Sequence, residues 1–182
     1  AGTGTKITKS TSTENKMMSY FFRAGYILKN RYLLTATLRA DGASVFAKNN
    51  KWGYFPSVAA GWTMSEENFM RNIDWLSNLK LRLSWGQTGN ADISTNAFAS
   101  YGAQGSWINS DYKTVSGVMK SRLENPDLKW ETTTEWNLGL DFGFLKSRIT
   151  GSVELYQRVI SDLLNYKPLN TYQEVKQVMA NI

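Results

Sequence analysis

Pairs of carboxylates are the residues of this sequence that come nearest to a catalytic arrangement. Glu131 and Glu135 share one face of a predicted strand, but a rise of roughly 3.3 Å per residue places them about 13 Å apart. An inverting glycosidase holds its two carboxylates only about 6.5–9.5 Å apart. Glu66 and Glu67 fall in the first turn of a predicted short helix, where acidic side chains stabilise the helix dipole. We therefore expect no enzymatic activity.

The chain contains no cysteine and no histidine. Their absence excludes disulfides, thiolate nucleophiles, Cys/His zinc sites and imidazole-based triads within these residues. The net charge of +6 comes with 21 Lys and Arg side chains that are scattered along the sequence. A nucleic-acid-binding surface normally clusters its positive charge. The sequence thus predicts no catalytic residue, no metal, no cofactor and no nucleic-acid partner.

Six segments alternate apolar and polar residues and are predicted to be β-strands: 18–28, 32–41, 54–64, 79–88, 130–142 and 148–159. Each has about 10 to 13 residues, which exceeds the roughly 5–6 of most globular strands. The length suits the roughly 9–11 residues with which a tilted strand crosses a bilayer. Strand length therefore favours a membrane barrel over a soluble sheet.

The connections differ in length in a regular way. Residues 29–31 and 143–147 form short predicted turns, whereas 42–53 and 89–129 are long. Residues 65–78 join the third and fourth strands, and there Ser65 is expected to cap a short helix with Phe69, Ile73 and Leu76 on one face. In an up-and-down meander, alternate connections lie at the same end. Short turns at one end and long loops at the other are typical of bacterial outer-membrane barrels.

The apolar faces of these strands are expected to be aliphatic in the middle and aromatic at both ends. The middle positions are Leu34, Ala36, Leu38, Val58, Ala60, Leu81, Leu83, Leu138 and Leu140. The rings expected near the long connections are Tyr20, Trp85 and Trp130, and those expected near the short turns are Tyr32, Trp62 and Phe142. This distribution is the girdle pattern of a lipid-facing surface.

The opposite face carries charged residues among Ser, Thr and Gly. The charges predicted to face a water-filled lumen are Arg23, Arg39, Lys80, Arg82, Glu131, Glu135, Asp141, Arg148 and Glu154. At any single strand, plain solvent exposure of a soluble sheet explains the pattern equally well. With length, connections and aromatic positions in agreement, we interpret these residues as cross-strand partners inside a barrel.

The last two strands allow a prediction of register. Apolar residues stay on one face only if paired residue numbers sum to an odd value. A four-residue loop at 143–146 then places Phe142 opposite Ser147 and Asp141 opposite Arg148. The same register places Glu131 opposite Arg158, and Glu135 opposite Glu154.

Several stretches resemble the SusC/RagA-type TonB-dependent outer-membrane transporters of Bacteroides-like bacteria. They include "RYLLTATLRADGASVFAKNNKWGYFPSVAAGW", "EENFM", "LSNLKLRLSWGQTGNADI", "NPDLKWETTTEWNLGLDF" and "RITGSVELYQRVISDLL". The resemblance implies an antiparallel barrel of about 22 strands with a plugged lumen. It further implies the outer membrane of a Gram-negative bacterium, a SusD-like lipoprotein lid, a TonB complex that acts through a separate plug, and a glycan or peptide as substrate.

Six strands leave open sheet edges, which lipid does not tolerate, so these residues are expected to be part of a larger barrel. We expect residues 1–17 to be a flexible loop remnant and 18–182 a partial TonB-dependent receptor barrel domain. The competing hypothesis is a soluble or surface β-sandwich that binds or adheres without transport. In the long connection, Tyr101, Trp107 and Tyr112 are candidates for contact with ligand or lid; alternatively, these rings pin the loop to its own barrel.

Overall fold

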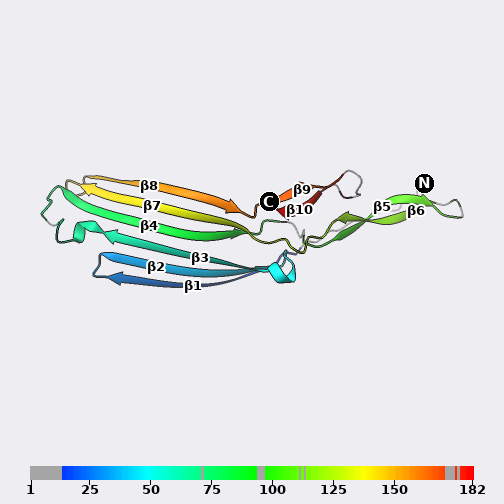
Figure 1. The fold of residues 1–182 in the computed structure, drawn as a ribbon, viewed down its shortest axis with the longest axis horizontal. Coiled ribbons are helices and arrows are strands. Elements are labelled where there is room, and N and C mark those ends of the chain that lie inside the picture. The colour runs from blue at the N-terminus through cyan, green and yellow to red at the C-terminus, as the bar shows by residue number, and fades with distance from the viewer. Residues whose placement is uncertain are drawn as a thin grey trace, which may run out of the picture.

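The fold is a six-stranded antiparallel sheet with two smaller hairpins at one end (Figure 1). A computed structural model describes residues 14–70, 72–93, 97–110, 112, 114–170, 175 and 177–182. The strands of the large sheet, in spatial order, are β1 (Met17–Leu28), β2 (Tyr32–Ala43), β3 (Trp52–Thr63), β4 (Leu76–Asn90), β7 (Glu131–Phe144) and β8 (Ile149–Ser161). The prediction of an all-β, antiparallel, up-and-down sheet of about six strands is confirmed. The expected flexible remnant falls mostly on residues 1–13, which lie outside the described residues.

The alternation of the sequence separates the sheet into two faces. We call the face that carries Leu34 and Leu83 the aliphatic face. We call the face that carries Arg39 and Glu135 the charged face. One cross-strand row of the aliphatic face runs through Tyr26, Leu34, Ala60, Leu83, Leu138 and Leu155. From Tyr32 to Leu38 of β2 the aliphatic-face side chains are exposed while their charged-face neighbours are half-buried. The sheet is therefore curved, with the charged face on its inner side.

The predicted register between the last two strands is wrong by four residues, although its parity is right. Phe142 pairs with Gly151 rather than Ser147, and the four-residue turn is Leu145–Arg148. Both registers keep the apolar residues on one face, so the hydrophobic pattern alone does not distinguish them. The observed register pairs Glu135 with Arg158, whereas the predicted one opposes two glutamates.

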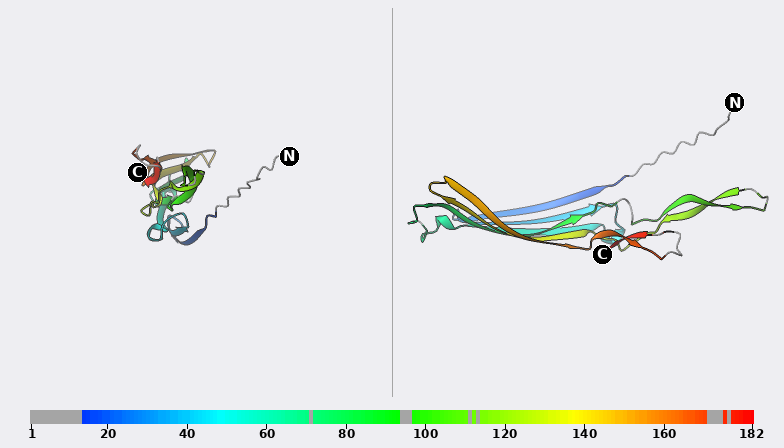
Figure 2. Two further views of the ribbon diagram at one scale, coloured as in Figure 1. Left: turned by 90° about the vertical axis from the view of Figure 1, so that its right-hand side faces the viewer. Right: turned by 90° about the horizontal axis from the view of Figure 1, so that it is seen from above.

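Two hairpins were not predicted. β5 (Ser100–Ile108) pairs with β6 (Thr114–Arg122) inside the long connection, and β9 (Leu164–Pro168) pairs with β10 (Gln177–Asn181) after the sheet. Both hairpins lie at the end of the sheet where the long connections are, and the β5–β6 hairpin extends away from it (Figures 1 and 2). We call this the long-connection end and the opposite one the tight-turn end.

The helix predicted at Ser65 does not form. A short 3-10 turn, η2 (Met64–Glu66), begins there instead, and Glu67 after it is extended, with φ −76° and ψ 148°. A second 3-10 turn, η1 (Lys48–Asn50), lies in the β2–β3 connection. Among the described residues, no helix has the length and apolar character needed to cross a membrane.

The largest cluster of buried apolar side chains lies at the long-connection end. It consists of Ala43, Val45, Phe46, Phe55, Ile93, Ala97, Leu128 and Trp130, and Leu164 and Met179 pack against it. Trp130 was predicted on the lipid face, and that prediction is wrong. Its side chain is only 6% exposed, with ring centroids 5.2 Å from Phe46 and 5.5 Å from Phe55. The β2–β3 connection folds over the end of the sheet and covers this ring.

Candidate functional site

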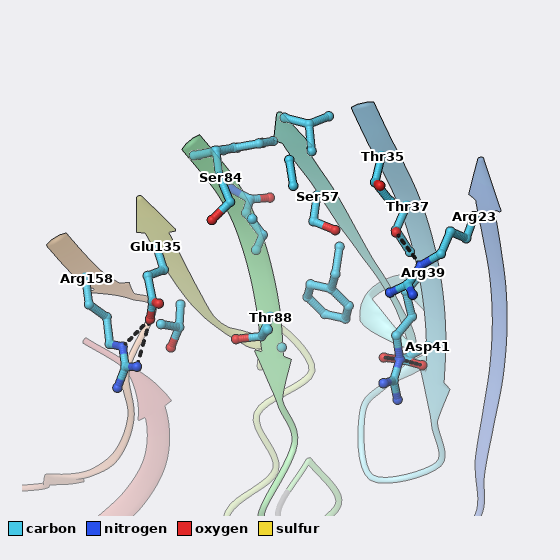
Figure 3. A pocket seen from close by; sticks show the side chains of 18 residues that line it. Arg23, Thr35, Thr37, Arg39, Asp41, Ser57, Ser84, Thr88, Glu135 and Arg158 are labelled. Carbon is cyan, nitrogen blue, oxygen red and sulfur yellow. Dashed lines mark hydrogen bonds and ion pairs between the residues drawn. The ribbon is translucent and has the colours of Figure 1, made fainter. Parts of the chain in front are cut away.

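The charged face of the sheet encloses a hollow of about 840 Å³ (Figure 3). Side chains from all six strands line it, and ten of them are labelled in the figure: Arg23, Thr35, Thr37, Arg39, Asp41, Ser57, Ser84, Thr88, Glu135 and Arg158. The lining is a mixture of hydroxyls, carboxylates and guanidinium groups.

One cross-strand row forms the floor of this hollow. Thr37 pairs with both Arg23 and Ser57, and Gly86 pairs with both Ser57 and Glu135, which in turn pairs with Arg158. Arg23 Nε donates to the Thr37 hydroxyl over 3.2 Å, and Arg158 Nη2 lies 2.7 Å from Glu135 Oε2. A guanidinium group thus stands at each edge of the row, with Thr37, Ser57, Gly86 and Glu135 between them.

A second charged group lies nearer the tight-turn end. Arg82 Nε and Nη2 each donate to Asp141 over 2.8 Å, and Nη2 also donates to Glu154 Oε1 over 2.7 Å. Gly139 makes this arrangement possible, because a Cβ there would lie 3.0 Å from the guanidinium carbon of Arg82. The guanidinium crosses β7 over the bare glycine and reaches a carboxylate on β8.

Most of the charges predicted to face a lumen share one face of the sheet. Arg23, Arg39, Lys80, Arg82, Glu135, Asp141 and Glu154 all sit at charged-face positions of the ladder. Glu131 stands at the end of β7, where it accepts hydrogen bonds from Asn90 Nδ2 and the Leu164 backbone and so ties β9 to the sheet. Arg148 was predicted on a strand, which is wrong: it is the last residue of the β7–β8 turn.

Two charged residues of the hollow were not among the predicted sites. Asp41 is buried and accepts from Arg39 Nε, the nearest distance being 2.7 Å. Its position two residues after Arg39 on one strand places both on the same face, and this spacing could have identified it. Arg158 shares the face of Glu154 by alternation along the strand, whereas its pairing with Glu135 depends on the register, which the sequence predicted incorrectly.

The aromatic candidates of the long connection do not form one cluster. Tyr101 is exposed at the root of the β5–β6 hairpin, where it pairs with Lys120. Tyr112 lies at the tip and is 91% exposed. Trp107 pairs with Val115 near the tip, and its side chain lies outside the described residues. Six residues of strand place the backbone of Tyr101 about 20 Å from that of Trp107.

These groups do not resemble a catalytic site. The guanidinium groups and carboxylates of the charged face are held by one another, and within the described residues no group of His, Cys, Asp and Glu could hold a metal ion. Hydroxyls and paired charges in a wide hollow suit a hydrated surface over which polar molecules pass or dock.

Comparison with known proteins gives the family. Residues 2–181 match the family described as "TonB dependent receptor-like, beta-barrel". The chain belongs to this family. It is a segment of an outer-membrane β-barrel, and members of the family are receptors and transporters rather than enzymes.

Individual relatives agree. TonB-dependent receptor SusC of Bacteroides thetaiotaomicron is 48% identical over 160 residues, which cover 85% of this chain and 16% of SusC. TonB-dependent receptor P39 of Formosa agariphila is 37% identical over 175 residues, covering 96% of this chain and 16% of that protein. The RagAB peptide transporter has a similar structure, with a TM-score of 0.82 and 28% identity over 92% of this chain and 18% of the RagAB chain. The chain therefore spans about a sixth of the length of these TonB-dependent receptors.

The buried cluster around Trp130 is expected to hold the connections at the long-connection end of the sheet in place. Trp130→Ala in the full-length protein should lower the free energy of unfolding by about 3–5 kcal/mol, because a large buried ring is lost and leaves a cavity. The 43–51 and 91–130 connections and the β9–β10 hairpin should all become sensitive to protease together, since each packs on this cluster. Denaturant unfolding in lipid and limited proteolysis measure both effects.

Tyr112→Ala is the matched control, because it removes an aromatic side chain that is exposed at the hairpin tip. It should leave both measurements unchanged. Trp130→Phe should fall between the two, since it keeps a ring but loses the hydrogen bond from Trp130 Nε1 to the Lys51 carbonyl. If these connections resisted protease in Trp130→Ala as well as they do in the parent protein, the proposed role of Trp130 in holding them would be contradicted.

Proposed function

We propose that this segment forms part of the wall and outer loops of a TonB-energised importer, with the aliphatic face against lipid and the charged face lining the barrel interior. The observation that carries the proposal is the contrast between an apolar row and a polar row that each cross the middle of all six strands, the first through Leu34 and Leu83 and the second through Arg23 and Glu135. Ala36, Val58 and Trp85 share one cross-strand row, and the neighbouring row of the opposite face is the floor of the polar hollow.

The aromatic side chains support this orientation. On the aliphatic face, Tyr20 stacks on Trp52 near the long-connection end, with ring centroids 6.0 Å apart. Tyr32 stacks on Trp62 near the tight-turn end, at 6.4 Å. Amphipathic rings at both ends of an aliphatic band are typical of the two membrane interfaces. Short turns face the periplasm in bacterial barrels, so we place the tight-turn end in the periplasm and the long connections outside the cell.

The likeness to SusC and RagAB supports the choice of partners. RagAB is described as a peptide transporter, and SusC as a TonB-dependent receptor. We propose that the full-length protein imports a glycan or a peptide, is covered by a SusD-like lipoprotein, and receives energy from the TonB complex through a plug domain outside this chain. The exposed β5–β6 hairpin, at the outer end of the sheet, is suited to contact with the lid or the substrate.

The competing hypothesis of a soluble β-sandwich is disfavoured by the aliphatic face. A sandwich covers such a face with a second sheet. Among the described residues, the other two sheets are short hairpins beyond the end of the large one. Leu34, Leu83 and Leu155 are all exposed, which suits a surface that lipid covers.

Leu83 and Ser84 test the assignment of the two faces, because they are adjacent in β4 and therefore lie at the same depth. Leu83→Arg in the full-length protein should cost about 2–4 kcal/mol, the range for a cation facing lipid at the bilayer midplane. Ser84→Arg should cost much less, since Ser84 lines the hollow. Equilibrium unfolding in lipid vesicles measures both. Equal losses for the two variants would mean that the faces are not distinguished by lipid.

The β5–β6 hairpin tests the proposed role of the outer loops. Tyr101 and Lys120 are paired, so residues 102–119 can be replaced by an Asn-Gly type I′ turn without cutting the large sheet. The deletion should abolish substrate uptake by cells that carry the full-length protein, while heat-modifiable migration on gels shows an assembled barrel. Lys120→Ala serves as control and should keep uptake. Normal uptake by the deletion variant would show that the hairpin is only a cover.

A further inference from the structure

A polar contact at the tight-turn end joins the β3–β4 connection to the aliphatic face. Glu67 Oε1 accepts hydrogen bonds from the Tyr32 hydroxyl over 2.6 Å and from Trp62 Nε1 over 3.1 Å. Glu67 Oε2 pairs with Arg31 Nη1 over 3.0 Å. The Glu67 side chain is only 13% exposed. One carboxylate therefore gathers the polar tips of two stacked rings and a neighbouring guanidinium group.

The position of these rings fixes where the connection runs. Tyr32 and Trp62 are cross-strand partners on the aliphatic face, so Glu67 lies at the rim of that face. The far end of the connection is held on the same face. The ring centroid of Trp75 lies 5.5 Å from that of Phe144, and the Leu145 backbone donates to the Trp75 carbonyl over 2.8 Å. Residues 64–75 are thus attached to the rim of the aliphatic face at both ends.

Large apolar side chains of this connection are exposed. Phe69 is 65% exposed and Trp75 is 58% exposed. A connection that faced only water would gain nothing from these rings, whereas Trp and Phe are favoured at the boundary between headgroups and acyl chains.

The neighbouring turns supply complementary charge for a lipid headgroup. The β1–β2 turn contributes Lys29, and the β7–β8 turn contributes Lys146 and Arg148. Neither turn contains an acidic residue. Basic side chains beside exposed rings fit a surface that carries phosphate groups.

We propose that residues 64–75 lie in the headgroup layer of the periplasmic leaflet, with Phe69 and Trp75 reaching the acyl chains of phospholipids and Glu67 acting as the positioning residue. The inference rests on the proposed orientation of the barrel. It adds a membrane-bound connection to the strands that already cross the bilayer. The element resembles an interfacial anchor rather than a free periplasmic loop.

The Glu67 contacts explain how a carboxylate is tolerated at this depth. A charge in a partly apolar layer is costly unless it is paired and hydrogen-bonded. The hydrogen bond from Tyr32, that from Trp62 and the Arg31 guanidinium hold the pKa of Glu67 below its usual range. The carboxylate therefore stays ionised and fully bonded at neutral pH.

The test places a fluorescent label on the connection in the full-length protein. The chain has no cysteine, so Phe69→Cys, Asp74→Cys and Leu83→Cys each give a single labelling site in this segment. The protein is reconstituted in nanodiscs of phosphatidylethanolamine and phosphatidylglycerol. Brominated acyl chains quench a label that lies in lipid, and iodide quenches one that lies in water. Asp74 is the polar control in the same connection, and Leu83 is the control for the lipid face.

Quenching by brominated lipid should be at least about twofold stronger at position 69 than at position 74, with the reverse order for iodide. Glu67→Ala should move the label at 69 towards water, whereas Glu67→Gln, which keeps an acceptor for Tyr32 and Trp62, should restore much of the parent pattern. If Glu67→Ala changes the quenching at position 69 but not at position 83, the sheet is still folded in the membrane. The effect is then on the position of the connection and not on the fold.

Two outcomes would overturn the inference. Iodide quenching at 69 as strong as at 74 would place the connection in water. Protection of 69 from both quenchers would mean that protein, not lipid, covers it. If position 83 also fails to contact lipid, the proposed orientation of the whole sheet fails. If 83 is in lipid and 69 is not, only the inference about residues 64–75 fails.

Discussion

Within a bilayer, no water is available to pair backbone N–H and C=O groups, so every strand must be bonded on both sides. This constraint governs the segment. Its strands are long, and each inner one is paired with a neighbour on both sides, with the shortest ladder, between β3 and β4, covering Ser57–Thr63 and Lys80–Gly86. The free edges of β1 and β8 require further strands, which the full-length receptor has room to supply, since the chain spans only 16% of SusC.

Once the backbone is paired, the side chains determine how the two faces differ. The aliphatic face carries unpaired apolar groups with rings at its ends, while the charged face carries guanidinium groups that are each held by carboxylates or hydroxyls. Gly139 shows how closely the second face is fitted, because a Cβ there would lie 3.0 Å from the Arg82 guanidinium, which reaches across β7 to Glu154.

The sequence predicted what depends on a period of two and missed what depends on distant contacts. Apart from Leu33, residues 32–41 alternate between apolar and polar side chains, so the division of these side chains between two faces was predicted correctly. The β7–β8 register was not, because two odd sums satisfy the same alternation. Trp130 has the same residue type as a girdle ring, and only the folding of the β2–β3 connection over it determines that it is buried. The helix at Ser65 fails because Glu67 is drawn towards donors on β2 and β3, which requires an extended backbone there.

The most direct test of the central claim, that this sheet separates lipid from a water-filled interior, is a cysteine scan of β2. Single cysteines at positions 33–40 of the full-length protein in native outer membranes would be exposed to a charged, membrane-impermeant maleimide. The account predicts reaction at the odd positions, including Thr35 and Arg39, and protection at the even ones, including Leu34 and Leu38. Uniform reactivity, or an alternation of the opposite phase, would contradict it.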